Sequence, residues 1–360
     1  MPPAVHQLIP SFTPRSAVGN HTLQVRALLH ELGVRSEVYV GEASREVVGI
    51  SRPFREYEGA PGDVLLYQAS TGSALADFVR TRDERLVVNY HNITPSAMFA
   101  PWEPHVAAEL VAGRRQVADL AARTTIAIAD SSYNAGELDA FGYRNTTVVP
   151  ILLDTATFER AVDTAALDRL RSAGARGATW LFVGRVAPNK AQHDLMKALA
   201  VYRRTYDPHA RLVLVGGSSS HAYWTALESY RAALQLDDAV TFAGDVTDGE
   251  LAAHYRAADV FVCASEHEGF CVPLLEAMHH ELPIVAYAST AVPETLGDGG
   301  ICIPSKAPTT FAAAVHRVLS DRALVDALAA AGRARLADFA LDRTRAAFAV
   351  ALAPVLDGQG

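Results

Sequence analysis

Short apolar runs alternate with helically spaced apolar positions along almost the whole chain. In the first helical stretch, valine and leucine recur at positions 25, 28, 29 and 32, which is the spacing of a buried stripe. Asn20 is its predicted N-cap and Gly33 its predicted C-terminal stop. The runs SEVYV, DVLLYQ, RLVVNYHN and TTIAIAD are rich in Val, Ile and Leu, which is typical of parallel strands covered on both faces.

The same pattern restarts after residue 154, with the strand-like runs TWLFVGR, RLVLVGG, AVTFAGD, DVFVCAS, PIVAYAS and GGICIP. Strands that alternate with helices through two halves predict an α/β protein of two doubly wound domains. We expect the first domain to span residues 1–152 and the second residues 153–340. Residues 341–360 contain a final Ala-rich helix.

Composition narrows the class of protein. A chain of 360 residues suits two domains of ordinary size, and a formal net charge of −8 argues against binding duplex nucleic acid. Three cysteines without a Cys-x-x-Cys pair are typical of reduced thiols. The sequence shows neither a leader pattern nor an apolar run of ~20 residues. We therefore expect a soluble, cytoplasmic protein without integral membrane association.

Ligands of open α/β sheets bind beyond the carboxyl ends of the strands, so polar residues at those ends are the candidates for a site. The loop GRVAPNK follows a predicted strand and places Gly184, Arg185 and Lys190 near a helix N-terminus. Two cations in such a loop can bind a diphosphate. The alternative is a loop whose basic side chains are merely solvated.

The stretch EHEGFCVPLLEAM follows another predicted strand. Glu268 lies in a glycine-containing loop, and Glu276 lies about one turn into the helix that Pro273 helps to begin. The two carboxylates can accept hydrogen bonds from two diols, with amides of the helix N-terminus between them. The alternative is a pair of surface carboxylates, with Glu276 supporting His280 at i+4.

Two motifs in the first half are less specific. In AVGNHTLQ, Gly19 permits close backbone approach to a ligand, although a plain strand-to-helix turn also explains it. In VVNYHNITP, His91 ends a strand and can bond a substrate hydroxyl, or be hydrogen-bonded into its own loop.

Together these motifs resemble the retaining glycosyltransferases of family 4, most strongly over residues 181–295 and continuing through AVGNHT, YHNITP and ADSSYN. The resemblance implies the GT-B architecture, in which two Rossmann-like domains face each other across a cleft. The N-terminal domain would bind the acceptor and the C-terminal domain the nucleotide-sugar donor. The helix within 341–360 would cross back onto the first domain.

The resemblance also implies roles for individual residues. Arg185 and Lys190 match the pair that neutralises the donor diphosphate. Glu268 matches the glutamate that contacts the transferred sugar, and Glu276 the one that holds the nucleotide ribose. His91 matches the histidine that approaches the C6 side of the sugar. These expectations make Arg185, Lys190, Glu268 and His91 the candidate catalytic residues.

The remaining expected contacts divide between donor and acceptor. The chain departs from the family in having one glycine, Gly19, where two adjacent glycines are common, and in having Cys271 at a position often filled by glycine. The expected donor-binding residues are Gly19, Gly184, Val246, Gly269, Phe270, Cys271, Val272 and Glu276. The expected acceptor-binding residues are Asn20, His21, Asn92 and Thr94.

The implied reaction moves a hexose-type sugar from a nucleoside diphosphate sugar to an acceptor hydroxyl with retained configuration. UDP is the expected nucleotide, with GDP as the alternative. No Asp-x-Asp motif is present, so we expect neither a metal nor another cofactor. A soluble small-molecule acceptor is expected, while its identity, the linkage and the oligomeric state stay open.

Rival functions remain at this stage. A sugar-nucleotide epimerase or a disaccharide phosphorylase on the same fold would use similar ligands. A nucleotide-sugar binding protein without turnover is a more distant class. A dinucleotide dehydrogenase is disfavoured, because no Gly-x-Gly-x-x-Gly follows a predicted strand.

Overall fold

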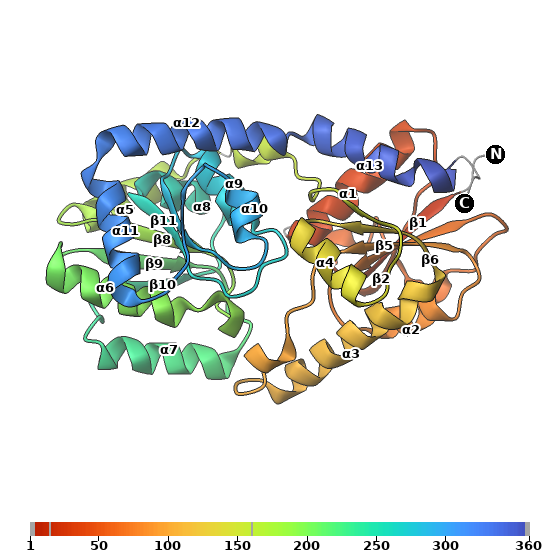
Figure 1. Cartoon of the computed structure of the whole chain (residues 1–360), viewed down its shortest axis with the longest axis horizontal. Helices are drawn as coiled ribbons and strands as arrows, with labels where there is room; N and C mark the ends of the chain where they lie inside the picture. Colours follow the sequence, from red (N-terminus) through yellow and green to blue (C-terminus); the bar gives the residue numbers. More distant parts are fainter. Residues whose placement is uncertain (1–3, 14–15, 160, 357–360) are drawn as a thin grey trace. The chain divides into compact units, whose positions relative to one another are not determined.

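The computed structural model describes residues 4–13, 16–159 and 161–356, and its contacts divide the chain into two compact units (Figure 1). The first unit holds the chain up to Ala100, Pro104–Asp154 and the chain from Phe339 onward. The second holds Pro101–Glu103 and Thr155–Asp338. The break therefore follows Asp154, close to the predicted one, whereas the sequence did not indicate that residues 101–103 join the second unit.

The first unit is built on a seven-stranded sheet in the order β3-β2-β1-β4-β5-β6-β7, in which every pairing is parallel. The order reverses between β1 and β4, which makes the ends of these strands the switch point of the sheet. The strands are β1 (Val5–Phe12), β2 (Val38–Ala43), β3 (Arg52–Pro53), β4 (Val64–Ala69), β5 (Arg85–Tyr90), β6 (Thr124–Ala129) and β7 (Thr146–Val148).

Five α-helices accompany this sheet among the described residues: α1 (Ala17–Glu31), α2 (Ala74–Arg80), α3 (Pro104–Leu120), α4 (Ser132–Ala140) and α13 (Leu341–Leu356). The last helix packs on the first unit, because its buried Phe348 and Leu352 belong to the same apolar cluster as Val5 and Val25. The chain thus returns to its first unit after completing the second.

The start of α1 differs from the prediction. The helix begins at Ala17, and the hydroxyl of Ser16 accepts a hydrogen bond of 3.0 Å from the amide of Gly19. The predicted N-cap Asn20 was wrong, because a serine one turn earlier already caps the helix. The predicted stop is confirmed, since Gly33 follows the helix with a φ of +74°.

The second unit is built on a six-stranded parallel sheet in the order β10-β9-β8-β11-β12-β13, with its switch point between β8 and β11. The strands are β8 (Thr179–Val183), β9 (Arg211–Val215), β10 (Val240–Gly244), β11 (Val260–Cys263), β12 (Ile284–Tyr287) and β13 (Ile301–Ile303). The predicted pair of doubly wound α/β domains is confirmed.

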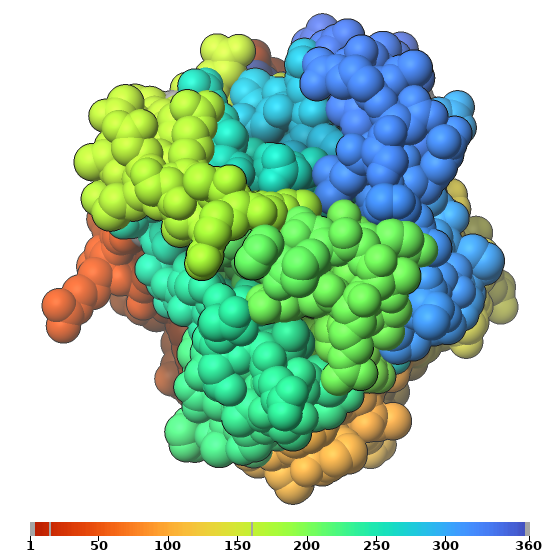
Figure 2. All heavy atoms as spheres, turned by 90° about the vertical axis from the view of Figure 1, so that its left-hand side faces the viewer, coloured from red at the N-terminus to blue at the C-terminus, as the bar shows by residue number. Residues whose placement is uncertain are grey.

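Helices cover the second sheet, and on the side of the molecule that Figure 2 shows, the yellow-green chain of α5 and the blue chain of α11 and α12 lie at the surface. The α-helices of this unit are α5 (Thr164–Gly174), α6 (Gln192–Thr205), α7 (His221–Ala233), α8 (Asp248–Ala257), α9 (Val272–His279), α10 (Val292–Leu296), α11 (Pro308–Ser320) and α12 (Arg322–Asp338). In the core between sheet and helices, Trp180 of β8 stacks on Phe311 of α11. Across the described parts of the chain, none of the helices is both long and apolar enough to span a membrane.

Candidate functional site

Three glycines with positive φ lie at the ends of neighbouring strands in the second unit. Gly184, Gly216 and Gly244 have φ angles of +151°, +134° and +68°. The amide of Gly216 donates to the carbonyl of Gly244 at 2.9 Å, and a Cβ on Gly216 would lie 2.3 Å from the carbonyl oxygen of Gly184. Only glycine permits this close packing of main chain. The main chain of neighbouring strands therefore packs closely at this carboxyl edge of the sheet.

The loop after β8 carries the two predicted cations. A 3₁₀ turn over Pro188–Lys190 and a left-handed Ala191, with φ +52°, lead into α6. The side chain of Arg185 is exposed, and within the described part of the chain its guanidinium has no partner. The carbonyl of Arg185 accepts a hydrogen bond from Gln192 at 2.9 Å, which fixes the loop against the first turn of the helix.

Lys190 pairs with Glu268 across the switch point of the second sheet. Its Nζ lies 2.6 Å from Oε1 of Glu268, and the two side chains are 17% and 10% exposed. Burial alone would lower the pKa of the Lys190 ammonium, but the attraction of Glu268 and their hydrogen bond outweigh it and raise the pKa. The ammonium is therefore charged at neutral pH. The sequence predicted both residues but not that they contact each other.

The loop after β11 is held in place from the segment after β12. The hydroxyl of Thr290 accepts from the amide of Glu268 and donates to its carbonyl, both at 2.9 Å. The hydroxyl of Thr295 donates to the carbonyl of Phe270 at 2.5 Å. These contacts fix the main chain around Glu268, so its carboxylate projects from a rigid support.

The N-terminus of α9 begins at a strained residue. Cys271 precedes the helix with a φ of +76°, and Pro273 lies in the first turn. Among the residues that the structure describes, the amides of Gly269, Cys271 and Val272 have no hydrogen-bond partner. Unbonded amides at a helix N-terminus favour an anion or a hydroxyl acceptor. Glycine adopts this left-handed conformation more readily than cysteine does.

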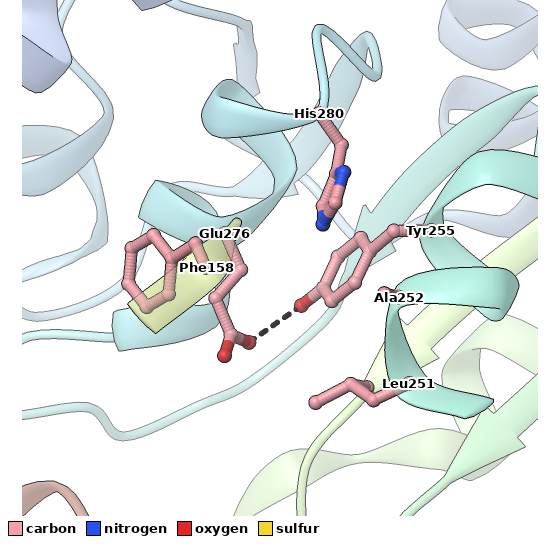
Figure 3. A pocket seen from close by; sticks show the side chains of 6 residues that line it. All are labelled: Phe158, Leu251, Ala252, Tyr255, Glu276 and His280. Atoms are coloured by element: carbon pink, nitrogen blue, oxygen red, sulfur yellow. Dashed lines mark hydrogen bonds between the residues drawn. The ribbon is translucent and has the colours of Figure 1, made fainter. Parts of the chain in front are cut away.

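Glu276 is held by a tyrosine that the sequence did not single out. Its carboxylate accepts a hydrogen bond of 2.7 Å from the hydroxyl of Tyr255 on α8 (Figure 3). The ring of His280 stacks on Tyr255 with centroids 5.0 Å apart, and burial lowers the pKa of His280 to about 4. A small pocket of about 10 Å³ lies between these side chains and Phe158. The only sequence signal for Tyr255 was its place one turn before the strand β11.

Val246, one of the expected donor-binding residues, also lies at this edge. Val246 is half-buried in the short loop between β10 and α8, directly before Thr247. Thr247 and Glu250 form a capping box that fixes the start of α8. The loop that contains Val246 is therefore held at its C-terminal end by this capping box.

Residues able to bind a metal also occur beside the lysine. Ligand atoms of Cys263, Glu268 and Cys271 lie within 4.8 Å of one another. The ammonium of Lys190 already lies against the Glu268 carboxylate, so a cation there would meet a positive charge. The group does not match the pattern of a resident metal centre.

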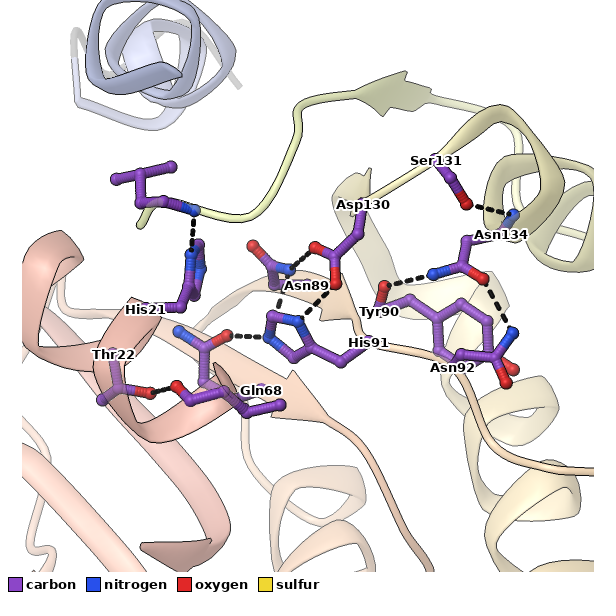
Figure 4. Close-up of polar contacts among 12 residues, drawn as sticks. His21, Thr22, Gln68, Asn89, Tyr90, His91, Asn92, Asp130, Ser131 and Asn134 are labelled. Atoms are coloured by element: carbon purple, nitrogen blue, oxygen red, sulfur yellow. Dashed lines mark hydrogen bonds and ion pairs between the residues drawn. The ribbon is translucent and has the colours of Figure 1, made fainter. Parts of the chain in front are cut away.

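In the first unit, His91 lies in a buried polar network at the end of β5 (Figure 4). Its side chain is only 1% exposed, and its Nδ1 lies 2.7 Å from a carboxylate oxygen of Asp130. Its Nε2 lies 2.7 Å from Oε1 of Gln68 and 3.3 Å from the amide nitrogen of Asn89. Both ring nitrogens therefore have side-chain partners. A substrate hydroxyl would have to replace one of them.

A chain of amides sets the orientation of Gln68. The carbonyl of Thr22 can only accept, and it binds the amide nitrogen of Gln7 at 3.0 Å. The oxygen of Gln7 then accepts from the amide nitrogen of Gln68 at 2.9 Å, which turns the oxygen of Gln68 toward His91. Gln68 and Asp130 were not predicted as site residues, and their place at buried strand ends was the available signal.

The residues predicted as ligand contacts near the start of α1 pack against other parts of the protein. A Cβ on Gly19 would lie 1.9 Å from the carbonyl oxygen of Thr13, so the glycine is required by the chain's own main chain. His21 is 1% exposed, and its Nδ1 accepts from the amide of Leu152 at 2.9 Å. This burial does not support the acceptor role predicted for His21. Asn20 is half-buried beside it.

The other two predicted acceptor residues follow β5. Asn92 has a φ of +78°, and its side-chain amide donates to Asn134 at 2.7 Å and to Glu137 at 3.1 Å. Thr94 is half-buried in the same loop. Arg114 of α3 donates to the carbonyl of Ile93 at 2.7 Å and holds this loop in place. Asn92 therefore shapes the loop.

Comparison with known proteins shows which family the second unit resembles. Residues 173–335 match the family model of the glycosyl transferases group 1.

This part of the chain is similar to the members of that family. The match covers the loops that carry Lys190 and Glu268 and the start of α9.

Sequence similarity to curated relatives extends into part of the first unit. A D-inositol 3-phosphate glycosyltransferase of Kineococcus radiotolerans is 33% identical over 277 residues, which is 71% of this chain and 63% of that protein. A GDP-mannose-dependent alpha-(1-6)-phosphatidylinositol monomannoside mannosyltransferase of Mycobacterium tuberculosis is 33% identical over 216 residues, 56% of this chain and 54% of that protein. The chain thus spans about half to two thirds of the length of these relatives.

Solved structures share the whole fold. Anabaena HepE in complex with UDP and glucose superposes with a TM-score of 0.77 at 18% identity, covering 97% of this chain and 99% of that one. The sucrose-phosphate synthase of Thermosynechococcus elongatus gives a TM-score of 0.77 at 20% identity, covering 99% and 100%. The fold is therefore that of the GT-B glycosyltransferases.

Proposed function

We propose that the protein is a glycosyltransferase that moves a hexose-type sugar from a nucleoside diphosphate sugar to an acceptor hydroxyl. The observation that carries the proposal is the pair of Lys190 and Glu268, 2.6 Å apart at the switch point of a group 1 domain. Beside this pair lie the amides of Gly269, Cys271 and Val272 at the start of α9. Cation, carboxylate and open amides together match a diphosphate joined to a polyol.

The proposed role of the cations is to stabilise the leaving diphosphate. As the sugar departs, negative charge grows on the β-phosphate, and an ammonium already held in place stabilises it without reorganisation. Lys190 is held by Glu268, while the exposed Arg185 on the same loop is able to swing onto a phosphate. Two such positive charges perform the task that a divalent ion performs elsewhere. We therefore propose a metal-independent reaction.

The proposed role of the carboxylates is to hold hydroxyl groups. Glu268 would orient the transferred sugar, since its second oxygen can accept a hydrogen bond while Oε1 pairs with Lys190. Glu276 would bind the ribose, with Tyr255 fixing its carboxylate. Val246 and Gly184 would contact the nucleotide through their backbones. In this arrangement neither glutamate acts as a nucleophile, which suits transfer with retention by attack on the same face.

The first unit would bind the acceptor. The curated relatives named above act on D-inositol 3-phosphate and on a phosphatidylinositol monomannoside, so a phosphorylated polyol is the first acceptor to test. We propose UDP as the nucleotide, which is also bound in the HepE structure, with GDP as the alternative that the mannosyltransferase raises. His91 would contact the sugar only if a sugar hydroxyl replaces Gln68 as the hydrogen-bond partner of its Nε2.

The test is a product assay in EDTA with UDP-glucose, UDP-N-acetylglucosamine and GDP-mannose, each with and without D-inositol 3-phosphate. A product that needs both donor and acceptor, with the donor's anomeric configuration by NMR, supports the proposal. Interconversion of the sugar nucleotide without an acceptor would indicate the epimerase. Dependence on inorganic phosphate would indicate the phosphorylase. Either of these results would replace the proposed function.

A further inference from the structure

All three cysteines of the chain lie in the second unit, and two of them have their sulfur atoms within 4.8 Å of each other beside the proposed donor site. Cys263 is the last residue of β11, and Cys271 is the residue before α9. Their sulfur atoms lie within 4.8 Å of each other and of a carboxylate oxygen of Glu268. Eight positions separate them in the sequence, so a bond between them would close a small ring that contains Glu268.

The fold explains why the two thiols meet. The φ of +76° at Cys271 turns the chain back toward the end of β11, and the hydroxyls of Ser289 and Thr295 fix the loop between the cysteines. Both residues are nearly buried, at 1% and 7% exposure. The third cysteine, Cys302, lies on β13 and is separated from β11 by β12. Two strand spacings are ~9–10 Å, which is too far for a disulfide.

The two thiols are electrostatically unequal. The proximity of the two sulfur atoms lowers the pKa of Cys263 and raises the pKa of Cys271 well above its usual value. Burial raises the pKa of Cys271 further, and the nearby Lys190 ammonium opposes this. A thiolate supported by a neighbouring thiol is the arrangement from which disulfides form. A soft metal ion is disfavoured at this place, because Lys190 occupies the third ligand, Glu268.

We propose that Cys263 and Cys271 form a reversible dithiol–disulfide modification site that responds to hydroperoxides. The thiolate of Cys263 attacks one oxygen of hydrogen peroxide, the O–O bond breaks, and a sulfenic acid and hydroxide result. The thiol of Cys271 then forms the S–S bond, and the sulfenic oxygen leaves as water with the thiol proton. Overall two thiols are oxidised and one peroxide is reduced to two waters. A small-molecule dithiol reverses the change.

The effect on donor binding rests on the proposed function. The bond would pull Cys271 toward β11 and change the main-chain torsions of the loop that presents the open amides. It would also constrain Glu268, whose carboxylate pairs with Lys190. We expect the oxidised protein to bind the nucleoside diphosphate roughly tenfold more weakly than the reduced protein.

The test begins with mass spectrometry, which needs no activity. Wild type and the Cys263→Ser and Cys302→Ser variants are treated with limiting hydrogen peroxide, alkylated and digested. We expect a linked Cys263–Cys271 peptide pair in wild type and Cys302→Ser, absent from Cys263→Ser, and lost on treatment with dithiothreitol. If both cysteines are found alkylated after oxidation, or if a disulfide involves Cys302, the proposal is wrong.

A calorimetric titration with the nucleotide then tests the link to the donor site. Oxidised wild type should bind more weakly than reduced wild type, while treated Cys263→Ser should bind as before. If the disulfide forms and affinity is unchanged, the regulatory part is wrong. If the reduced protein binds no nucleotide, the proposed function fails, while the peptide map still decides the modification site.

Discussion

Replacing Lys190 by alanine should affect stability and turnover for two separable reasons. The change leaves the carboxylate of Glu268, 10% exposed, without the partner that lies 2.6 Å away. An unpaired charge in a fully buried pair costs about 3–5 kcal/mol, and the partial exposure here reduces this to about 2 kcal/mol of unfolding free energy. Loss of the ammonium at the leaving phosphate should lower turnover by about 10²–10³-fold.

The double variant Lys190→Ala/Glu268→Gln separates the two effects. Neutralising the carboxylate should recover most of the lost stability, whereas turnover should stay low, because the phosphate still lacks its cation. Urea denaturation gives the free energies of unfolding, and steady-state product formation gives kcat. Arg333→Ala is the control, since it removes an ion pair with Glu281 whose side chains are 55% and 56% exposed, and it should cost less than 1 kcal/mol.

Two results would refute this reasoning. If Lys190→Ala loses stability but keeps its kcat, the ammonium does not act on the leaving group. If the double variant regains both stability and kcat, the lysine serves only to neutralise Glu268. Either outcome would remove Lys190 from the proposed catalytic residues.

The remaining predictions concern single contacts. Tyr255→Phe removes the hydroxyl 2.7 Å from Glu276 and should raise KM for the donor about fivefold with kcat unchanged; an unchanged KM would remove the tyrosine from the site. The pKa of His280 is lowered from 6.5 to about 4, so its contribution to stability is complete above pH 6.5 and is lost as pH falls toward 4. Because the ring is partly exposed, we expect the wild type to lose about 1–2 kcal/mol of unfolding free energy by this effect. The urea midpoint of His280→Gln should therefore fall less than that of the wild type between pH 7 and pH 4.5. An equal fall in both proteins would contradict this. Gly19→Ala places a Cβ 1.9 Å from a main-chain oxygen and should cost about 1–3 kcal/mol, whereas Gly136→Ala, with open space around it, should not destabilise; equal melting temperatures would argue against the contact.

The strand and helix pattern was readable from the sequence because parallel strands buried on both faces are continuously apolar. The motifs at strand ends could be predicted because ligands bind at the carboxyl edge of such sheets. The contact between Lys190 and Glu268 was not readable, because it joins loops 78 residues apart across the switch point. The place of Tyr255 beside Glu276 likewise depends on how α8 and α9 pack.

The start of α1 was misread for a local reason. Both Ser16 and Asn20 are good N-cap residues, and the apolar stripe begins after both of them. Gly19 was interpreted as a ligand contact, whereas the structure shows a close approach to Thr13. The sequence cannot distinguish a glycine required by the chain's own main chain from one required by a ligand.

The central claim is that the strand ends of the second unit bind the nucleoside diphosphate of a sugar donor. The most direct measurement is calorimetric titration of wild type and Glu276→Ala with UDP, GDP and ADP, repeated in EDTA. The account predicts that one nucleotide binds to wild type at one site per chain, equally well in EDTA, and that Glu276→Ala binds it more weakly. No binding of any nucleotide to wild type, or equal binding to both proteins, would contradict it.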